Sequence, residues 1–189
     1  MKTFRLFLIL IILTSVQIVN GQETIIDTNK ANIKWTASKK VGGSHNGEIQ
    51  LKIGVVKFEK DKIVKAHFIL DMNSITNNDL KNKIYNAKLV NHLKSEDFFS
   101  VDKYPTAELI INNISNFTND KAFVYGKITI KGITQDITFE INRNNNIYTA
   151  RIEIDRSKFD VRYGSDSFFD NLGDKVINDI FIIDVSIVI

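Results

Sequence analysis

Apolar and polar residues alternate along much of the chain, and the alternation is most regular between residues 64 and 72. One face of this segment is apolar and comprises Val64, Ala66, Phe68, Leu70 and Met72. The other face is mostly polar and includes Lys65, His67 and Asp71. A period of two residues is typical of a β-strand with one buried face. The pattern therefore predicts a strand whose apolar side chains point into the protein interior.

Similar segments recur and predict about eight strands, most of them separated by turns of hairpin length. Such short connections favour an antiparallel sheet. Leu80, Ile84, Ala87 and Asn91 follow a different spacing, which predicts one short helix inserted in the middle of the chain. Eight long, bent strands close into a barrel whose interior holds one slender ligand. A two-sheet sandwich with a solid core is the alternative that the pattern leaves open.

The segment His92–Pro105 is the least periodic part of the chain. It contains adjacent phenylalanines, Phe98 and Phe99, and the only proline. Because Pro105 lacks a backbone donor and disfavours helix at the residue before it, the helix must end upstream. Two interpretations follow. The segment is either a packed helix-to-strand connection whose phenylalanines fill the core, or the rim of a binding cavity.

The first residues have the pattern of a secretory signal peptide. Lys2 and Arg5 precede an uninterrupted apolar run from Leu6 to Leu13, which is too short to span a bilayer comfortably. We expect residues 1–21 to be removed and residues 22–189 to form one domain. The mature chain would then begin at Gln22 and be exported to the periplasm or the extracellular space of a bacterium.

Composition narrows the classes of partner. Removal of Lys2 and Arg5 leaves the mature chain with a net charge of about +1. No dense basic patch interleaved with aromatic residues is present, so we do not expect nucleic acid as a partner. The chain has no cysteine, which excludes disulfides, thiol chemistry and a lipid anchor on cysteine. Stability must therefore come from the sheet and its packing.

The sequence contains no recognisable catalytic constellation. His45, His67 and His92 lie in separate segments without the spacing of metal ligands. There is no GxSxG nucleophile motif and no phosphate-binding Walker loop. We therefore predict no catalytic residues, no metal site and no cofactor.

Eight short motifs together resemble the YceI-like family of exported bacterial lipid-binding proteins. Their order and spacing are more specific than any one of them. They are Gly43–Gly47, Gly54–Phe58, Asp71–Ile75, His92–Phe99, Tyr104–Ala107, Gly126–Thr134, Asp155–Asp160 and Gly173–Val176. The chain departs from the frequent family pattern after Asp27, where Thr28 and Asn29 replace His-Ser.

The resemblance implies an all-β fold: an extended, eight-stranded, antiparallel, lipocalin-like β-barrel with a long apolar pore. It also implies that the pore binds an isoprenoid lipid of the polyprenyl phosphate or isoprenoid quinone type, and it supplies no catalytic residues. The residues that we expect to line the pore are Val64, Ala66, Phe68, Leu70, Met72, Phe98 and Phe99. The candidates for contact with the lipid headgroup are His45, His92 and Lys94.

The isoprenoid lipid is the expected partner, with transient membrane contact and a monomeric or homodimeric state. Two other functions stay open. The first is a structural or stress-response barrel whose core is filled by its own side chains. The second is an enzyme that acts on a prenyl lipid, with His92 as the acid or base.

Overall fold

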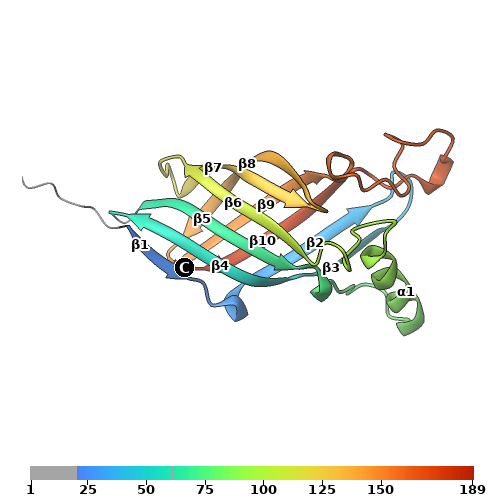
Figure 1. Ribbon diagram of the computed structural model, residues 1–189, viewed down its shortest axis with the longest axis horizontal. Coiled ribbons are helices and arrows are strands. Elements are labelled where there is room, and N and C mark those ends of the chain that lie inside the picture. Colours follow the sequence, from blue (N-terminus) through green and yellow to red (C-terminus); the bar gives the residue numbers. More distant parts are fainter. Residues whose placement is uncertain (1–20, 61) are drawn as a thin grey trace, which may run out of the picture.

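A computed structural model describes residues 21–60 and 62–189. Residues 1–20, which hold nearly all of the expected signal peptide, lie outside the described residues. Within the described part, ten strands form one antiparallel sheet (Figure 1). They are β1 (Gln22–Ile25), β2 (Asn32–Ser38), β3 (Ser44–Glu48), β4 (Gln50–Glu59), β5 (Lys62–Asp71), β6 (Thr106–Ile114), β7 (Lys121–Ile130), β8 (Ile133–Asn144), β9 (Ile147–Asp155) and β10 (Ile180–Val188).

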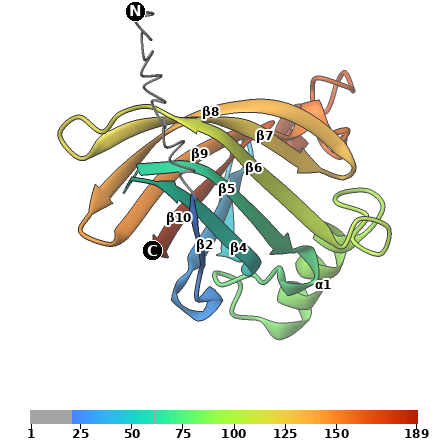
Figure 2. The ribbon, with the colours of Figure 1, turned by 60° about the vertical axis from the view of Figure 1, so that its left-hand side comes forward.

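The sheet closes on itself because each of its two edge strands continues into a strand near the opposite edge, β1 into β2 and β3 into β4. The strand order is β1-β4-β5-β6-β7-β8-β9-β10-β2-β3. Only Ile49 separates β3 from β4, and the short 3-10 helix η1 (Thr28–Lys30) separates β1 from β2. Since β2 pairs with β3 and β1 pairs with β4, the two broken strands run side by side and bring the sheet edges together (Figure 2).

This architecture confirms the predicted lipocalin-like antiparallel barrel with one helix. The number of strand segments is ten rather than eight. The difference arises because one long strand is broken at Ile49 and another at η1. At the second break, the side chain of Asp27 accepts a hydrogen bond from the backbone N–H of Asn29 at 3.1 Å and caps η1.

The helix α1 (Lys83–Lys94) begins and ends later than the sequence spacing predicted. Its first turn is capped by Asn82, whose side chain accepts hydrogen bonds from the backbone N–H groups of Ile84 and Tyr85. Asn77 and Asp79, two polar residues that precede the helix, have other partners. Asn77 donates to the carbonyl of Asn46, and Asp79 accepts from the backbone N–H of Asn46. These contacts tie the segment before α1 to β3.

A register shift in β5 changes which side chains face the interior. Lys65 pairs with Lys57 on β4, but the next pair is Ile63 with Phe58, so Val64 is an extra residue in the ladder. Such a bulge interrupts the alternation of faces. As a result, Ile63 occupies the inward position that the sequence pattern had assigned to Val64.

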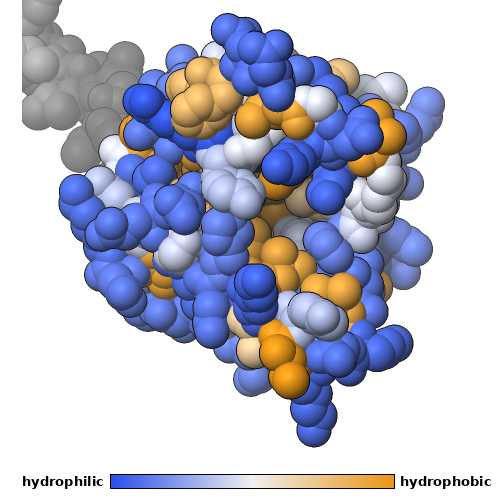
Figure 3. Space-filling view, turned by 90° about the vertical axis from the view of Figure 1, so that its right-hand side faces the viewer, coloured by the Kyte–Doolittle hydropathy of each residue, from blue (hydrophilic) through white to orange (hydrophobic). Residues whose placement is uncertain are grey.

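The two ends of the barrel differ. One end holds the β6–β7 and β8–β9 turns, and the other holds α1 and the long segment between β9 and β10 (Figure 1). That segment contains the short 3-10 helices η3 (Arg156–Phe159) and η4 (Gly173–Lys175). We call this second end, together with the turn 39–43, the α1 end. Figure 3 views it directly and shows a hollow with apolar side chains around and within it.

Gly47 on β3 allows the backbone of Thr76 to lie close against this strand at the α1 end. Any side chain there would collide with the carbonyl oxygen of Thr76 and approach Nε1 of Trp35 to 2.7 Å. The indole N–H of Trp35 donates to that same carbonyl at 3.0 Å. We therefore predict that Gly47→Ala displaces Thr76, breaks this hydrogen bond and lowers the free energy of unfolding by about 1–3 kcal/mol.

Chemical denaturation followed by the fluorescence of Trp35, the only tryptophan, measures this effect. Gly43→Ala is the matched control, because an added Cβ there meets no atom within 4 Å. Equal stability of the two variants would contradict the assigned role of Gly47.

Candidate functional site

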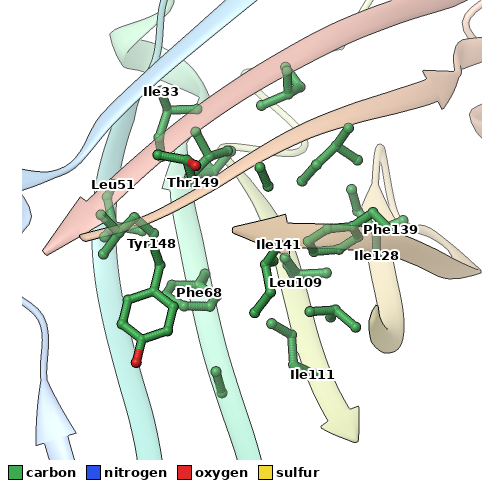
Figure 4. Close-up of a pocket in the computed structure, with 18 of the residues that line it drawn as sticks. Ile33, Leu51, Phe68, Leu109, Ile111, Ile128, Phe139, Ile141, Tyr148 and Thr149 are labelled. Atoms are coloured by element: carbon green, nitrogen blue, oxygen red, sulfur yellow. The ribbon is translucent and has the colours of Figure 1, made fainter. Parts of the chain in front are cut away.

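The interior of the barrel contains an apolar cavity of about 130 Å³. Its walls come from β4 to β10 and from β2, and they carry almost only aliphatic and aromatic side chains. Figure 4 shows the rings of Phe68 and Phe139 and the side chains of Leu109 and Ile128 directed toward this space. The inward residues of neighbouring strands therefore do not fill the barrel completely.

A second apolar cavity of about 100 Å³ lies toward the α1 end. Its lining includes Trp35, Met72, Leu93, Phe98 and Phe99. Both cavities share several wall residues, which are Leu70, Ala107, Ile128, Ile154 and Ile183. The two cavities thus lie next to each other along the barrel interior, and we refer to them together as the apolar tube.

The structure places most of the expected pore residues along this tube. Ala66 and Phe68 line the first cavity, and Leu70 lines both. Met72 lines the second cavity. Val64 lines neither cavity, because the bulge in β5 puts Ile63 there instead. Contact of these residues with a ligand remains a prediction.

Phe98 and Phe99 both pack into the core and border the second cavity. Phe98 is 7% exposed and packs edge-on against the ring of His92, with centroids 5.6 Å apart. Phe99 packs against Phe181 of β10 at 6.4 Å. Both rings also line the second cavity. The connection after α1 is therefore a packed core element and a cavity wall at once.

The three headgroup candidates have separate partners and line neither cavity. Nδ1 of His45 lies 2.7 Å from a carboxylate oxygen of Asp79. Nζ of Lys94 donates to the carbonyl of Asn73 at 2.6 Å. The ring of His92 stacks edge-on against Tyr163 at 4.4 Å, and its Nε2 is buried without a hydrogen-bond partner within the described chain.

Asp79 is the most perturbed acid near this end. Partial burial acts to raise its pKa, but hydrogen bonds from Asn46, His45 and Asn77 outweigh burial and lower the pKa to about 2. The carboxylate is therefore charged throughout the neutral range. The folded-state pKa of Asp79 is below its ordinary value. Its contribution to stability is therefore present when the pH is above the ordinary pKa, and it is lost as the pH falls toward 2.

Arg156 is the site residue that sequence reasoning missed. It is 2% exposed and forms part of the wall of the second cavity. Burial lowers its pKa, while the carboxylates of Asp179 and Asp155 oppose this shift. Its guanidinium group donates to carbonyl oxygens of the segment between β9 and β10 at the α1 end. These are the carbonyls of Asn178 (3.1 Å), Val161 (3.0 Å), Tyr163 (2.7 Å) and Ile177 (3.0 Å).

Four of the five N–H groups of Arg156 donate to these carbonyls, and Oδ1 of Asp179 forms an ion pair with Nη2 at 3.2 Å. Arg156 therefore fixes the segment between β9 and β10, and most of its donors are directed to that segment. Its motif, Asp155–Asp160, was visible in the sequence, but burial of a charged residue cannot be deduced from that motif.

Other polar groups do not converge on the tube. His67 faces outward, where its Nε2 lies 2.6 Å from a carboxylate oxygen of Glu108. Among the described residues, no group of three or more His, Asp or Glu side chains is arranged to hold a metal ion. The helices in the described part include none that is both long and apolar enough to span a membrane.

The fold and the cavities define a lipocalin-like barrel with an apolar interior. The chain belongs to the YceI-like domain family, which it matches over residues 25–189. A UPF0312 protein of Shewanella denitrificans is 24% identical over 126 residues, which cover 65% of this chain and 62% of the relative. A UPF0312 protein of Staphylococcus aureus is 39% identical over 54 residues, 29% of each chain. The matches thus span less than two thirds of these relatives.

Solved structures share the fold over more of the chain. BcnA of Burkholderia cenocepacia is 26% identical with a TM-score of 0.66, covering 87% of this chain and 99% of BcnA. A polyisoprenoid binding domain of Saccharophagus degradans is 12% identical with a TM-score of 0.58, covering 86% and 95%. The YCEI protein of Campylobacter jejuni is 17% identical with a TM-score of 0.52, covering 98% and 96%.

The first cavity generates a prediction about Phe68. Phe68→Trp adds volume to a wall that borders open space, so we expect little loss of thermal stability. The same enlargement in a close-packed core would cost about 1–3 kcal/mol. We also expect the larger ring to narrow the tube and weaken binding of a fluorescent prenyl probe.

Melting and probe binding are measured on both Phe68→Trp and the control His67→Trp, whose side chain lies on the outer face. The control should bind the probe as the unaltered protein does. Marked destabilisation of Phe68→Trp together with unchanged probe binding would contradict a ligand tube at this position.

Proposed function

We propose that this protein binds the apolar tail of an isoprenoid lipid in its barrel and sequesters or carries that lipid after export. The observation that carries the proposal is the apolar tube made by the two neighbouring cavities. Membership of the YceI-like family supports it. So does the shared fold with the Saccharophagus degradans domain, which is described as binding polyisoprenoids.

The driving force is removal of hydrocarbon from water. Each buried CH₂ group contributes about 0.8 kcal/mol, so a tail of several prenyl units has a large gross stabilisation. Loss of translational and conformational freedom opposes much of it. The cavities of about 130 and 100 Å³ are each comparable to one that holds a single aromatic ring. A longer tail therefore requires both cavities and rotation of half-buried side chains such as Phe68 and Phe99.

The polar headgroup is proposed to remain outside the tube. Arg156 is a charged side chain in the wall of the second cavity, but four of its five N–H groups donate to backbone carbonyls. Placing an unpaired phosphate in the apolar tube would be costly. We therefore propose that the headgroup lies at the α1 end, near His92 and Lys94, which flank the cavity-lining residue Leu93.

Binding rather than catalysis is the function that the site supports best. A general acid or base must reach its substrate within hydrogen-bond distance. His92, the candidate acid or base, does not line either cavity. Incubation of the protein with prenyl diphosphate or polyprenyl phosphate should accordingly return the lipid unchanged.

Organic extraction of the protein purified from its native host tests the proposal. Mass spectrometry of the extract should find an isoprenoid lipid in an amount comparable to the protein. Ala107→Phe, which adds a ring to a position that both cavities share, should reduce the recovered lipid while the barrel remains folded by circular dichroism. Recovery of no lipid, together with no binding on reconstitution, would refute the carrier function.

A further inference from the structure

The α1 end of the barrel exposes an unusual set of large apolar side chains. Ile84 and Tyr85 in the first turn of α1 are 78% and 63% exposed. Val41 in the β2–β3 turn is 61% exposed. Phe168 and Phe169, in the segment between β9 and β10, are 38% and 49% exposed. Exposed apolar residues on separate segments indicate an interaction surface when they gather on one face.

Contacts between these segments show that they gather at one end. The backbone N–H of Lys40 donates to the carbonyl of Val176 at 3.0 Å, and the side chain of Lys40 pairs with Asp166. His92 of α1 packs against Tyr163. The turn 39–43, α1 and residues 162–176 therefore surround the same part of the barrel. Figure 3 shows apolar side chains around the hollow in this face.

The helix at this face is also basic. Between Leu80 and Ser95 the chain carries four lysines, one histidine and no acidic residue. Lys81, Lys83 and Lys88 are exposed and form no ion pair within the described chain. The segment 162–176 is different, since it carries negatively charged aspartates as well as the positively charged Arg162 and Lys175. Positive charge is thus concentrated on α1, beside Ile84 and Tyr85.

Exposed aliphatic and aromatic residues beside lysines are the composition of a surface that lies on an anionic bilayer. We propose that the protein docks on anionic lipid membranes through the α1 end, with Ile84, Tyr85, Phe168 and Phe169 entering the interface and the α1 lysines contacting headgroups. This inference rests on the proposed function, because docking here would place the second cavity against the membrane that supplies or receives the lipid.

A second copy of the chain fits this face less well. A two-fold contact through α1 would bring the same lysine-rich helix against itself. No carboxylate lies between Leu80 and Ser95 to neutralise these lysines, Asp79 already accepts hydrogen bonds from Asn46 and Asn77, and Glu96 and Asp97 follow the opposite end of α1 from Ile84 and Tyr85. A bilayer that contains anionic lipid supplies both the apolar region and the opposite charge.

Vesicle flotation tests the proposal with the chain from Gln22 onward, which contains every strand of the described barrel and lacks the apolar leader. Vesicles of phosphatidylcholine alone are compared with vesicles that also contain phosphatidylglycerol. We expect the protein to bind the mixed vesicles and to bind phosphatidylcholine alone at least tenfold more weakly. Removal of each lysine should lower the affinity for the mixed vesicles about fivefold. The variant Lys81→Gln/Lys83→Gln/Lys88→Gln should therefore bind roughly a hundredfold more weakly.

A second test variant, Ile84→Ser/Tyr85→Ser, should bind the mixed vesicles at least about tenfold more weakly. Its matched control on the barrel wall is Phe123→Ser/Tyr125→Ser, at exposed positions of β7, which should keep binding. Lys34→Gln/Lys52→Gln/Lys65→Gln, at exposed positions of other strands, should also keep binding. Equal losses in the wall variants, or no binding of the unaltered protein to mixed vesicles, would overturn the inference.

Two further measurements separate this inference from its alternatives. Binding of a detergent-delivered prenyl probe should be unchanged in Ile84→Ser/Tyr85→Ser, so a failure to dock is distinguished from a failure to bind lipid. Light scattering coupled to size exclusion should give the same mass for this variant and the unaltered protein. A dimer that dissociates on this double substitution would assign the face to a second copy and refute membrane docking.

Discussion

The alternation of side chains along closed antiparallel strands is the constraint on which the rest of the structure depends. Each strand must present one apolar face inward, and curling of the sheet brings these faces around a common axis. Side chains of ordinary size then cover the wall without filling the centre, which leaves the two neighbouring cavities. The same geometry that stabilises the sheet therefore produces the candidate binding site.

The α1 end of the tube also needs a defined shape. Arg156 supports this shape by donating to carbonyls of the segment between β9 and β10, while Phe98 and Phe99 pack the connection that follows α1. A buried arginine would be costly if its donors were unpaired. Its four hydrogen bonds to carbonyls and its ion pair with Asp179 explain how a charged side chain can form part of the wall of an apolar cavity.

Sequence patterns predicted the antiparallel strands and the helix, because alternation and helical spacing are local properties of the chain. They assigned Ala66, Phe68 and Leu70 to the interior for the same reason. The barrel followed from the resemblance to the YceI-like family, since the pattern alone left a two-sheet sandwich open. Val64 was misplaced because a bulge depends on the register between β4 and β5, which no single strand encodes. The helix begins at Lys83, after the cap Asn82, rather than earlier because Asn77 and Asp79 have tertiary partners around β3. The burial of Arg156 likewise depends on contacts made across the fold.

The central claim is that a lipid tail occupies the tube rather than a site on the outer wall. Trp35 is the only tryptophan and lines the second cavity, so it reports on occupancy from within. Titration with a polyprenyl lipid whose tail carries a bromine or nitroxide quencher measures this directly. The account predicts saturable quenching of Trp35 with one lipid per barrel, reversed by unlabelled lipid. Binding of the labelled lipid without quenching of Trp35 would contradict it.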